Sequence, residues 1–210
     1  MNLAFVGYGA LGRQIETIVT QVSQAKSVVY FDDQAHRAGM PGAHPFAAHV
    51  DAEFTAYRFY VCLGYKHLAL KAQLVQRLLE LGRAVPSVVH PSAYVDPTAR
   101  LGDGASVYPG CTVDQRVVIG RGTLLNAGVV VAHDTAIGDA CWLGPGVTLS
   151  GDVRVGSGCF LGSGSTVSNH IEIGADAVVG LATAVTKHVA AGTSVIGNPM
   201  RVLSRKLNLL

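Results

Sequence analysis

The chain has 210 residues, which suits one or two domains with a sizeable hydrophobic core. Only 14% of its residues are charged and its net charge is +2, which gives no support for nucleic acid or a membrane surface as a partner. No apolar run is long enough to span a bilayer. Low charge with 25 glycines and 49% apolar residues predicts tight, repetitive packing, with part of the surface hidden in an oligomer.

The cysteines favour a reducing compartment. They form no CxxC pair, and the apolar start of the chain lacks the basic region of a signal peptide. We therefore expect free thiols in a cytoplasmic protein at Cys62, Cys111, Cys141 and Cys159.

Residues 1–87 alternate between strand and helix patterns. "NLAFV" reads as a strand that runs into a glycine turn, and an amphipathic helix follows with Ile15, Ile18, Val19 and Val22 at helical spacing. Further strands are predicted over 27–33 and 58–64. A second long helix is predicted over 66–82, with Leu70, Leu74 and Leu78 on one face and Gly82 as its end. This alternation predicts an α/β domain with a small parallel sheet, a half-Rossmann unit.

The glycine turn fits a phosphate site. Gly7, Gly9 and Gly12 form a GxGxxG pattern between strand and helix, and Asp32 lies twenty residues after Gly12, where an acidic side chain can hold a ribose hydroxyl. A full dinucleotide fold needs two such halves, so one nucleotide or a nucleotide-sugar fits better than NAD. A tight turn without any ligand is the third interpretation.

Residues 88–210 follow a six-residue repeat that neither helix nor ordinary strand produces. Aliphatic side chains recur without a miss at Val95, Leu101, Val107, Val113, Ile119, Leu125, Val131, Ile137, Leu143, Leu149, Val155, Leu161, Val167, Ile173, Val179 and Val185. Such a repeat predicts an all-β left-handed parallel β-helix with three hexads, about 18 residues, per triangular coil. Small residues two positions earlier, Cys141 and Cys159 among them, should fill the narrow interior. A basic tail, "RVLSRKLNLL", follows as a solvated end.

Corners of the coil fall two and three residues after each aliphatic. The second corner residue is often glycine, which adopts positive φ at little cost: Gly104, Gly110, Gly122, Gly128, Gly146, Gly158 and Gly164.

One corner differs from all the others, because His133 and Asp134 join an imidazole to a carboxylate. Histidine there can accept a proton near neutral pH, and the aspartate can fix its tautomer. Gly151 lies eighteen residues later, hence on the same corner one coil on, about 4.8 Å away, where its N–H can donate to an oxyanion. This arrangement suggests acyl transfer, and the alternative is a surface histidine that caps a turn. His170 and His188 also stack but lack a carboxylate neighbour, and we read them as ordinary turn residues.

With these features, the chain resembles the left-handed β-helix sugar acyltransferases of the sialic acid O-acetyltransferase (NeuD) type, and most of all the PglD-like nucleotide-aminosugar N-acetyltransferases. The resemblance rests on "FVGYGALGRQIE", "VYFDD", "VVHPSAYVDPTARLG", the hexads, "NAGVVVAHDTAIGD" and "VIGNPMRV". It implies a homotrimer with active sites between subunits, acetyl-CoA as cosubstrate, a nucleotide-activated sugar as partner and no metal.

The resemblance also implies a role for individual residues. His133 is the expected general base, Asp134 orients it, Asn126 positions the acceptor, and the amide of Gly151 faces the thioester carbonyl. The nucleotide-sugar is expected at Gly7, Gly9, Leu11, Gly12, Asp32, Asp33, Gly64 and Trp142. Acetyl-CoA is expected at Gly151, Gly162, Gly180, Ala182, Lys187, Gly197 and Pro199.

Two positions leave the identity of the acceptor undetermined, because relatives usually carry histidine where this chain has Leu11 and Trp142. The main expectation is N-acetylation of a nucleotide-linked aminosugar. O-acetylation of a sialic acid, a non-catalytic nucleotide-sugar-binding trimer and an NAD-linked oxidoreductase are the alternatives. A zinc site is disfavoured, since the hexads contain no HxxxxH pair.

Overall fold

A computed structural model describes residues 1–204, so residues 205–210 of the basic tail lie outside the described part. The chain divides into two compact units, Met1–Val88 and Val89–Leu210. None of the helices in residues 1–204 has the length and apolar character needed to cross a bilayer.

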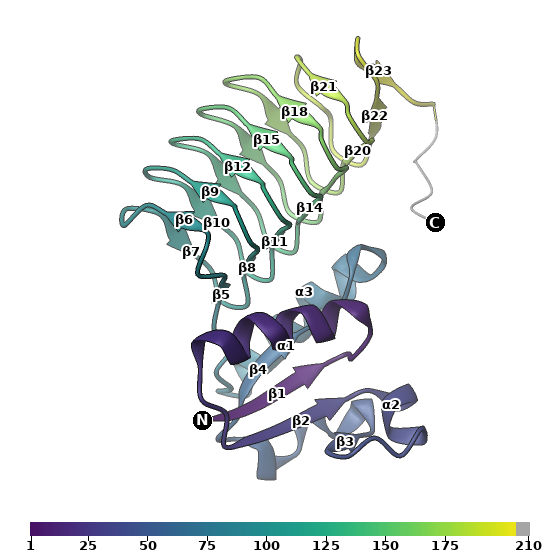
Figure 1. Ribbon diagram of the computed structural model, residues 1–210. Coiled ribbons are helices and arrows are strands. Elements are labelled where there is room, and N and C mark those ends of the chain that lie inside the picture. The colour runs from purple at the N-terminus through teal and green to yellow at the C-terminus, as the bar shows by residue number, and fades with distance from the viewer. Residues whose placement is uncertain (205–210) are drawn as a thin grey trace. The chain divides into compact units, whose positions relative to one another are not determined.

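The N-terminal unit is built on a four-stranded parallel sheet in the order β3-β2-β1-β4 (Figure 1). Its strands are β1 (Asn2–Val6), β2 (Ser27–Phe31), β3 (Ala43–His44) and β4 (Arg58–Val61). Its helices are α1 (Ala10–Val22), α2 (Asp33–Arg37) and α3 (Leu68–Glu80), with the short 3-10 helices η1 (Phe46–Val50), η2 (Ala52–Phe54) and η3 (Tyr65–His67). The predicted α/β unit is confirmed, whereas the short elements β3, α2 and η1–η3 had no periodic signal that could predict them.

The sheet core explains which face of each helix is buried. Ala4 and Val6 of β1 pack in one cluster with Leu74, Val75 and Leu78 of α3. Because side chains alternate along a strand, the buried Leu3 and Phe5 point to the opposite face.

Two sequence expectations for these helices are wrong. Leu70 is 40% exposed, and the inner face of α3 instead contains Lys71, which is 1% exposed. Position 71 is in phase with 74, 75 and 78 at 3.6 residues per turn, while position 70 is about 100° away from it. Val22, at the end of α1, is exposed as well.

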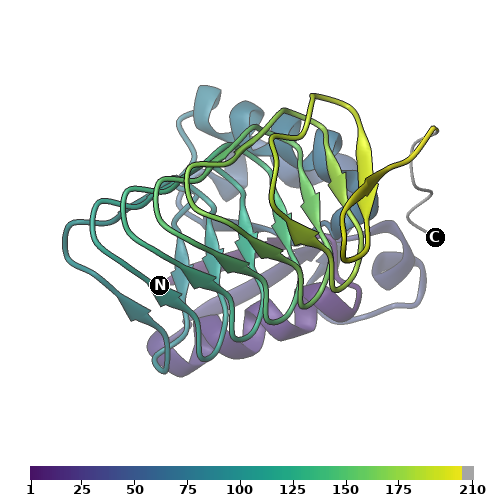
Figure 2. The same cartoon turned by 90° about the horizontal axis from the view of Figure 1, so that it is seen from above.

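The second unit is a left-handed parallel β-helix with three faces (Figures 1 and 2). Face 1 holds β6 (Tyr94–Val95), β9 (Thr112–Val113), β12 (Val130–Val131), β15 (Thr148–Leu149), β18 (Thr166–Val167) and β21 (Ala184–Val185). Face 2 holds β7 (Arg100–Leu101), β10 (Val118–Ile119), β13 (Ala136–Ile137), β16 (Arg154–Val155) and β19 (Glu172–Ile173). Face 3 holds β5 (Val88–Val89), β8 (Ser106–Val107), β11 (Leu124–Leu125), β14 (Trp142–Leu143), β17 (Phe160–Leu161), β20 (Val178–Val179), β22 (Ser194–Ile196) and β23 (Arg201–Val202), the last antiparallel to β22.

The six-residue repeat sets the register of the coils. Each strand from β6 to β21 ends at one of the sixteen predicted aliphatic residues. Each strand from β6 to β18 pairs with the strand eighteen residues on, as Val131 does with Leu149. All four cysteines are free and buried, and Cys111, Cys141 and Cys159 occupy the narrow interior. The corner glycines named above all have positive φ, between 62° and 71°.

Candidate active site

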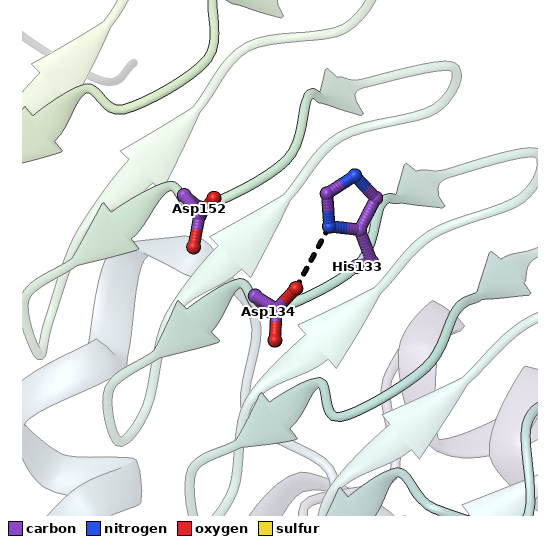
Figure 3. A group of neighbouring side chains, drawn as sticks. All are labelled: His133, Asp134 and Asp152. Carbon is purple, nitrogen blue, oxygen red and sulfur yellow. Dashed lines mark hydrogen bonds and ion pairs between the residues drawn. The ribbon is translucent and has the colours of Figure 1, made fainter.

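The corner between β12 and β13 carries the paired histidine and aspartate. Nδ1 of His133 lies 2.8 Å from Oδ2 of Asp134 (Figure 3). Asp134 has a positive φ of 60°, and its N–H donates to the carbonyl of Gln115 on the preceding coil at 3.0 Å. The turn geometry and the stacking of coils therefore both hold the carboxylate beside the imidazole.

Gly151 lies on the next coil, directly against the imidazole. The N–H of Asp152 donates to the carbonyl of His133 at 3.0 Å, which stacks the two corners. A Cβ built on Gly151 would be 2.7 Å from Cε1 and 2.8 Å from Nε2 of His133. The ring thus occupies the space that any side chain at position 151 would need.

A fourth residue of this site, Arg116, was missed from the sequence. Its Nε donates to Oδ1 of Asp134 at 2.6 Å and its Nη2 to Oδ2 at 2.8 Å. The hydrogen bonds from Arg116, followed by the one from His133, hold the pKa of Asp134 well below its ordinary value. Arg116 precedes Asp134 by the eighteen residues of one coil. The same spacing rule that placed Gly151 beside His133 could therefore have placed Arg116 beside Asp134.

These corners stack into one polar edge, here called the His133 edge, made of Gln115–Arg116, His133–Asp134, Gly151–Asp152, Asn169–His170 and Lys187–His188. Asp152 lies one coil beyond Asp134 (Figure 3), and its Oδ2 is 3.6 Å from Nδ1 of His170. His133, Asp134 and Asp152 each place one possible metal-ligand atom within 4.8 Å of the others. Both oxygens of Asp134 are already bound by Arg116, however, so the group is built as an ion-pair network and not as a metal site.

Two hollows flank the His133 edge. One of about 170 Å³ lies on face 1 and is lined by Ser150, Thr166, Val167, Ser168, Ala184, Val185 and Thr186. Another of about 710 Å³ lies on face 2, where Arg154, Glu172 and His188 are its charged or titratable lining residues. Ser150 immediately precedes Gly151, so the first hollow begins next to the imidazole.

Most of the remaining residues predicted for the β-helix lie away from the His133 edge. Lys187 is on the His133 edge, but Asn126 follows β11 and its Oδ1 accepts from the N–H of Ala127 at 2.8 Å. Trp142 lies on β14, and the predicted cofactor residues at or after the ends of face 3 strands are Gly162, Gly180, Ala182, Gly197 and Pro199. One copy of the chain therefore does not bring these residues together with His133.

The glycine turn of the N-terminal unit is shaped by close contacts. Gly7 has a φ of 85°, and a Cβ on Gly12 would be 2.7 Å from the carbonyl oxygen of Gly7. Both glycines are therefore required by the turn itself.

Asp32 is fully engaged by backbone N–H groups. Its Oδ2 accepts from Tyr8 at 2.8 Å, and its Oδ1 accepts from Gln34 and Ala35 at 2.9 Å each. Burial acts to raise the pKa of Asp32, but these three N–H groups outweigh it, so the pKa lies below its ordinary value. The carboxylate thus ties the glycine turn to the start of α2.

A pocket of about 420 Å³ opens at the carboxyl ends of β1 and β2. It is lined by Tyr8, Gly9, Arg13, Asp32, Gln34, Ala35, Ala38 and Met40. Gly9 and Asp32 were predicted substrate residues. The other predicted residues Gly7, Leu11, Gly12, Asp33 and Gly64 do not line it, although Gly7 and Gly12 shape its turn. Asp33 accepts a hydrogen bond from the N–H of Phe46 at 2.9 Å.

Known proteins share this two-part architecture. A family model described as bacterial transferase hexapeptide (six repeats) matches residues 134–169. No curated protein matches the sequence. Among solved structures, a variant of perosamine N-acetyltransferase from Caulobacter crescentus in complex with CoA and GDP-perosamine is 28% identical, with a TM-score of 0.90 and 98% of each chain covered.

Two more distant structures show the same fold. The acetyltransferase domain of PglB from Neisseria gonorrhoeae, in complex with acetyl coenzyme A, is 24% identical, with a TM-score of 0.88 over 96% of this chain and 98% of that chain. WeeI from Acinetobacter baumannii is 22% identical, with a TM-score of 0.86 over 97% of this chain and 100% of that chain. The two more distant structures show the fold alone, and the likeness to the Caulobacter crescentus enzyme confirms the resemblance to nucleotide-aminosugar acetyltransferases that the sequence suggested.

Proposed function

We propose that this chain, an acetyl-CoA-dependent acyltransferase, transfers an acetyl group to the amine of a nucleotide-linked aminosugar. The observation that carries the proposal is the contact of His133 with both Asp134 and Gly151, which places a base beside the backbone of Gly151. The likeness to an N-acetyltransferase solved with CoA and GDP-perosamine supports the choice of an amine as acceptor.

The geometry suits direct attack on the thioester. Because Asp134 is ionised at neutral pH, Nδ1 of His133 carries the proton that it donates to the carboxylate, and Nε2 is left to accept one. The acceptor amine forms its bond to the acetyl carbonyl carbon while Nε2 takes the proton from nitrogen. The carbon–sulfur bond then breaks, and the CoA thiolate takes that proton from the imidazolium.

Gly151 would stabilise the charge that develops on the carbonyl oxygen. Its N–H donates a hydrogen bond to no residue among 1–204, so it is available to an oxyanion. The hollow on face 1 begins at the neighbouring Ser150 and offers space for the thioester arm.

The pocket beside the glycine turn would hold the nucleotide part of the acceptor. Arg13 supplies a cation in the first turn of α1, and the N-terminus of that helix favours an anion such as the diphosphate. Asp32 would act by holding the turn in shape, since its oxygens already accept three N–H bonds.

A homotrimer with active sites between subunits is part of the proposal. Val118 on face 2 and Val130 on face 1 are exposed apolar residues on the two faces that meet at the His133 edge. Contact between copies along this edge would cover both valines and enclose His133. Light scattering of the purified chain measures the mass and contradicts this part if the chain is monomeric.

The test of function is an acetyl-transfer assay with acetyl-CoA and a panel of acceptors. GDP-perosamine, aminosugars on other nucleoside diphosphates and free sialic acid are compared, with products identified by mass spectrometry. We expect N-acetylation of a nucleotide-linked aminosugar, and a loss of at least about 100-fold in kcat for His133→Ala. Full activity of that variant, or acetylation of sialic acid alone, contradicts the proposal.

A further inference from the structure

The His133 edge has side chains where the edge between faces 3 and 1 has glycine. Four successive coils place a non-glycine residue with positive φ at the second corner position: Arg116 (57°), Asp134 (60°), Asp152 (58°) and His170 (60°). On the edge between faces 3 and 1, the same position is glycine in four successive coils, at Gly110, Gly128, Gly146 and Gly164. Left-handed conformations cost L-residues conformational free energy, and only Asn and Asp tolerate them comparatively well. Glycine at position 116 would therefore adopt this turn with less backbone strain than arginine does.

Arg116 uses this strained position mainly to bind Asp134, and its Nη1 also donates to Oε1 of Gln115 at 3.3 Å. Its guanidinium binds both carboxylate oxygens of Asp134, at 2.6 Å and 2.8 Å, and Oδ2 is the oxygen that also faces Nδ1 of His133. A carboxylate held at both oxygens by a planar fork cannot rotate freely. The direction of the hydrogen bond to His133 is therefore fixed from the preceding coil.

We propose that Arg116 is a positioning residue for acetyl transfer, which acts through Asp134 to hold the imidazole of His133 with Nε2 beside Gly151. This inference rests on the proposed function, in which His133 is the base. It adds a residue that touches neither substrate nor the reacting atoms and that occupies a strained backbone position because its side chain is needed there.

Charge gives Arg116 a second effect on the same ring. Asp134 faces His133 from its own corner and Asp152 from the following coil, with His170 beyond it, while Arg116 is the cation on the preceding coil. Without the guanidinium, two carboxylates act on the imidazole with less compensation, which favours its protonated form. The acidic limb of the pH–rate profile should then move to higher pH, because more of the enzyme holds a base that is already protonated.

Arg116→Gly separates positioning from a structural role. The substitution removes the guanidinium and also relieves the left-handed strain, so we expect an unchanged or higher Tm together with a kcat about tenfold lower. The KM for acetyl-CoA should stay within about twofold, and the acidic limb should move to higher pH. Arg116→Lys, which keeps the charge but loses the fork, should keep the wild-type pH profile and recover only part of kcat.

Asp176→Gly is the matched control. Asp176 has the same backbone conformation, with a φ of 57°, on a different edge of the prism, between β19 and β20. Because aspartate tolerates this conformation better than arginine, Asp176→Gly should leave Tm unchanged or raise it slightly, and it should keep full activity. If Arg116→Gly also keeps wild-type kcat and pH profile, in an enzyme that His133→Ala inactivates, the proposal is overturned.

Imidazole ¹H–¹⁵N NMR tests the inference without any acceptor sugar, with His133→Gln used to assign the signal. The wild-type ring should show the Nδ1–H tautomer, and Arg116→Gly should show a mixture of tautomers and a titration midpoint at higher pH. An unchanged tautomer and midpoint overturn the role of Arg116. Failure of the acetyl-transfer assay alone would instead count against the proposed function.

Discussion

The imidazole of His133 lies against the backbone of Gly151, one coil further along the β-helix. The space between them is so small that a Cβ at position 151 would come within 2.7 Å of the ring. The backbone of Gly151 does not have the positive φ that favours glycine, so the ring and not the turn accounts for the missing side chain. This relationship makes the site sensitive to a single methyl group.

Gly151→Ala should therefore reduce activity more than stability. The new methyl group displaces the imidazole from the N–H that would bind the oxyanion, and we expect kcat to fall by about 100-fold. Steady-state kinetics and thermal unfolding on the same preparation check this. A variant with wild-type kcat would show that the ring need not lie at Gly151.

Gly128→Ala is a control that should reduce stability more than activity. A Cβ at Gly128 meets no atom within 4 Å, but its φ is 69°. The substitution should cost about 1 kcal/mol of unfolding free energy from backbone strain and leave kcat per folded molecule unchanged.

Asp134 should make the stability of the β-helix depend on pH in acid. Its pKa is held below the unfolded value of about 4, first by Arg116 and then by His133. The stabilisation is therefore complete above about pH 4 and is lost as the pH falls toward the folded pKa. Urea midpoints of wild type and Asp134→Asn should differ at about pH 7, and the difference should shrink progressively as the pH falls below about 4. Because the pair with Arg116 is partly exposed, the difference should also shrink in about 1 M salt; a difference that persists in acid contradicts the ion pair.

Asp32 should matter for the shape of the glycine turn. Asp32→Ala removes the cap of α2 and the acceptor for Tyr8, which we expect to cost about 1–2 kcal/mol of unfolding free energy. Asp32→Asn can keep an oxygen toward Gln34 and Ala35 but then presents an N–H₂ group to the N–H of Tyr8. It should lose less stability than Asp32→Ala while raising the KM for the nucleotide-sugar. Chemical denaturation and acceptor kinetics test both, and equal KM values in Asp32→Asn and wild type contradict the role in the turn.

The β-helix was predictable because its packing is periodic. Each aliphatic side chain of the repeat points into the prism, as that of Val131 does. Because one coil takes eighteen residues, two residues eighteen apart in the sequence lie next to each other on adjacent coils. This arithmetic was sufficient to bring Gly151 to His133. Counting eighteen residues back from Asp134 also leads to Arg116. From the sequence, however, an arginine at a corner is indistinguishable from a solvated residue, and only the structure shows its guanidinium bound to both carboxylate oxygens.

The N-terminal unit was predictable only in outline. Its sheet followed from alternating strand and helix patterns, but the lining of its pocket depends on side-chain directions that no period encodes. Tyr8, Arg13 and Met40 line that pocket, and nothing in their spacing marks them. The glycine pattern gave the position of the turn, whereas the engagement of Asp32 by three N–H groups required coordinates.

Lys71 is the clearest failure of the periodic pattern, and it leads to a prediction about stability. Leucines at 70, 74 and 78 suggested the inner face of α3, yet the buried side chain is the lysine at 71. Burial lowers the pKa of Lys71 to about 8, with the Cys62 thiol group opposing part of that shift. Compared with about 10.4 in the unfolded chain, this corresponds to a cost of about 3 kcal/mol while the amine is charged.

Lys71→Met should accordingly stabilise the protein at neutral pH. Below about pH 8 the Lys71 amine is charged in the folded and the unfolded chain, and the cost of burying the charge is fully present. Between about pH 8 and pH 10.4 the unfolded chain binds more protons than the folded chain, so wild-type stability rises with pH. The advantage of Lys71→Met, up to about 3 kcal/mol at pH 7, should therefore fade toward about pH 10.4. Lys66→Met, at an exposed lysine of η3, is the control and should change stability by less than about 0.5 kcal/mol. Denaturant unfolding at both pH values decides the matter, and a Lys71→Met variant less stable than wild type at neutral pH would mean that the buried ammonium is compensated within the folded protein.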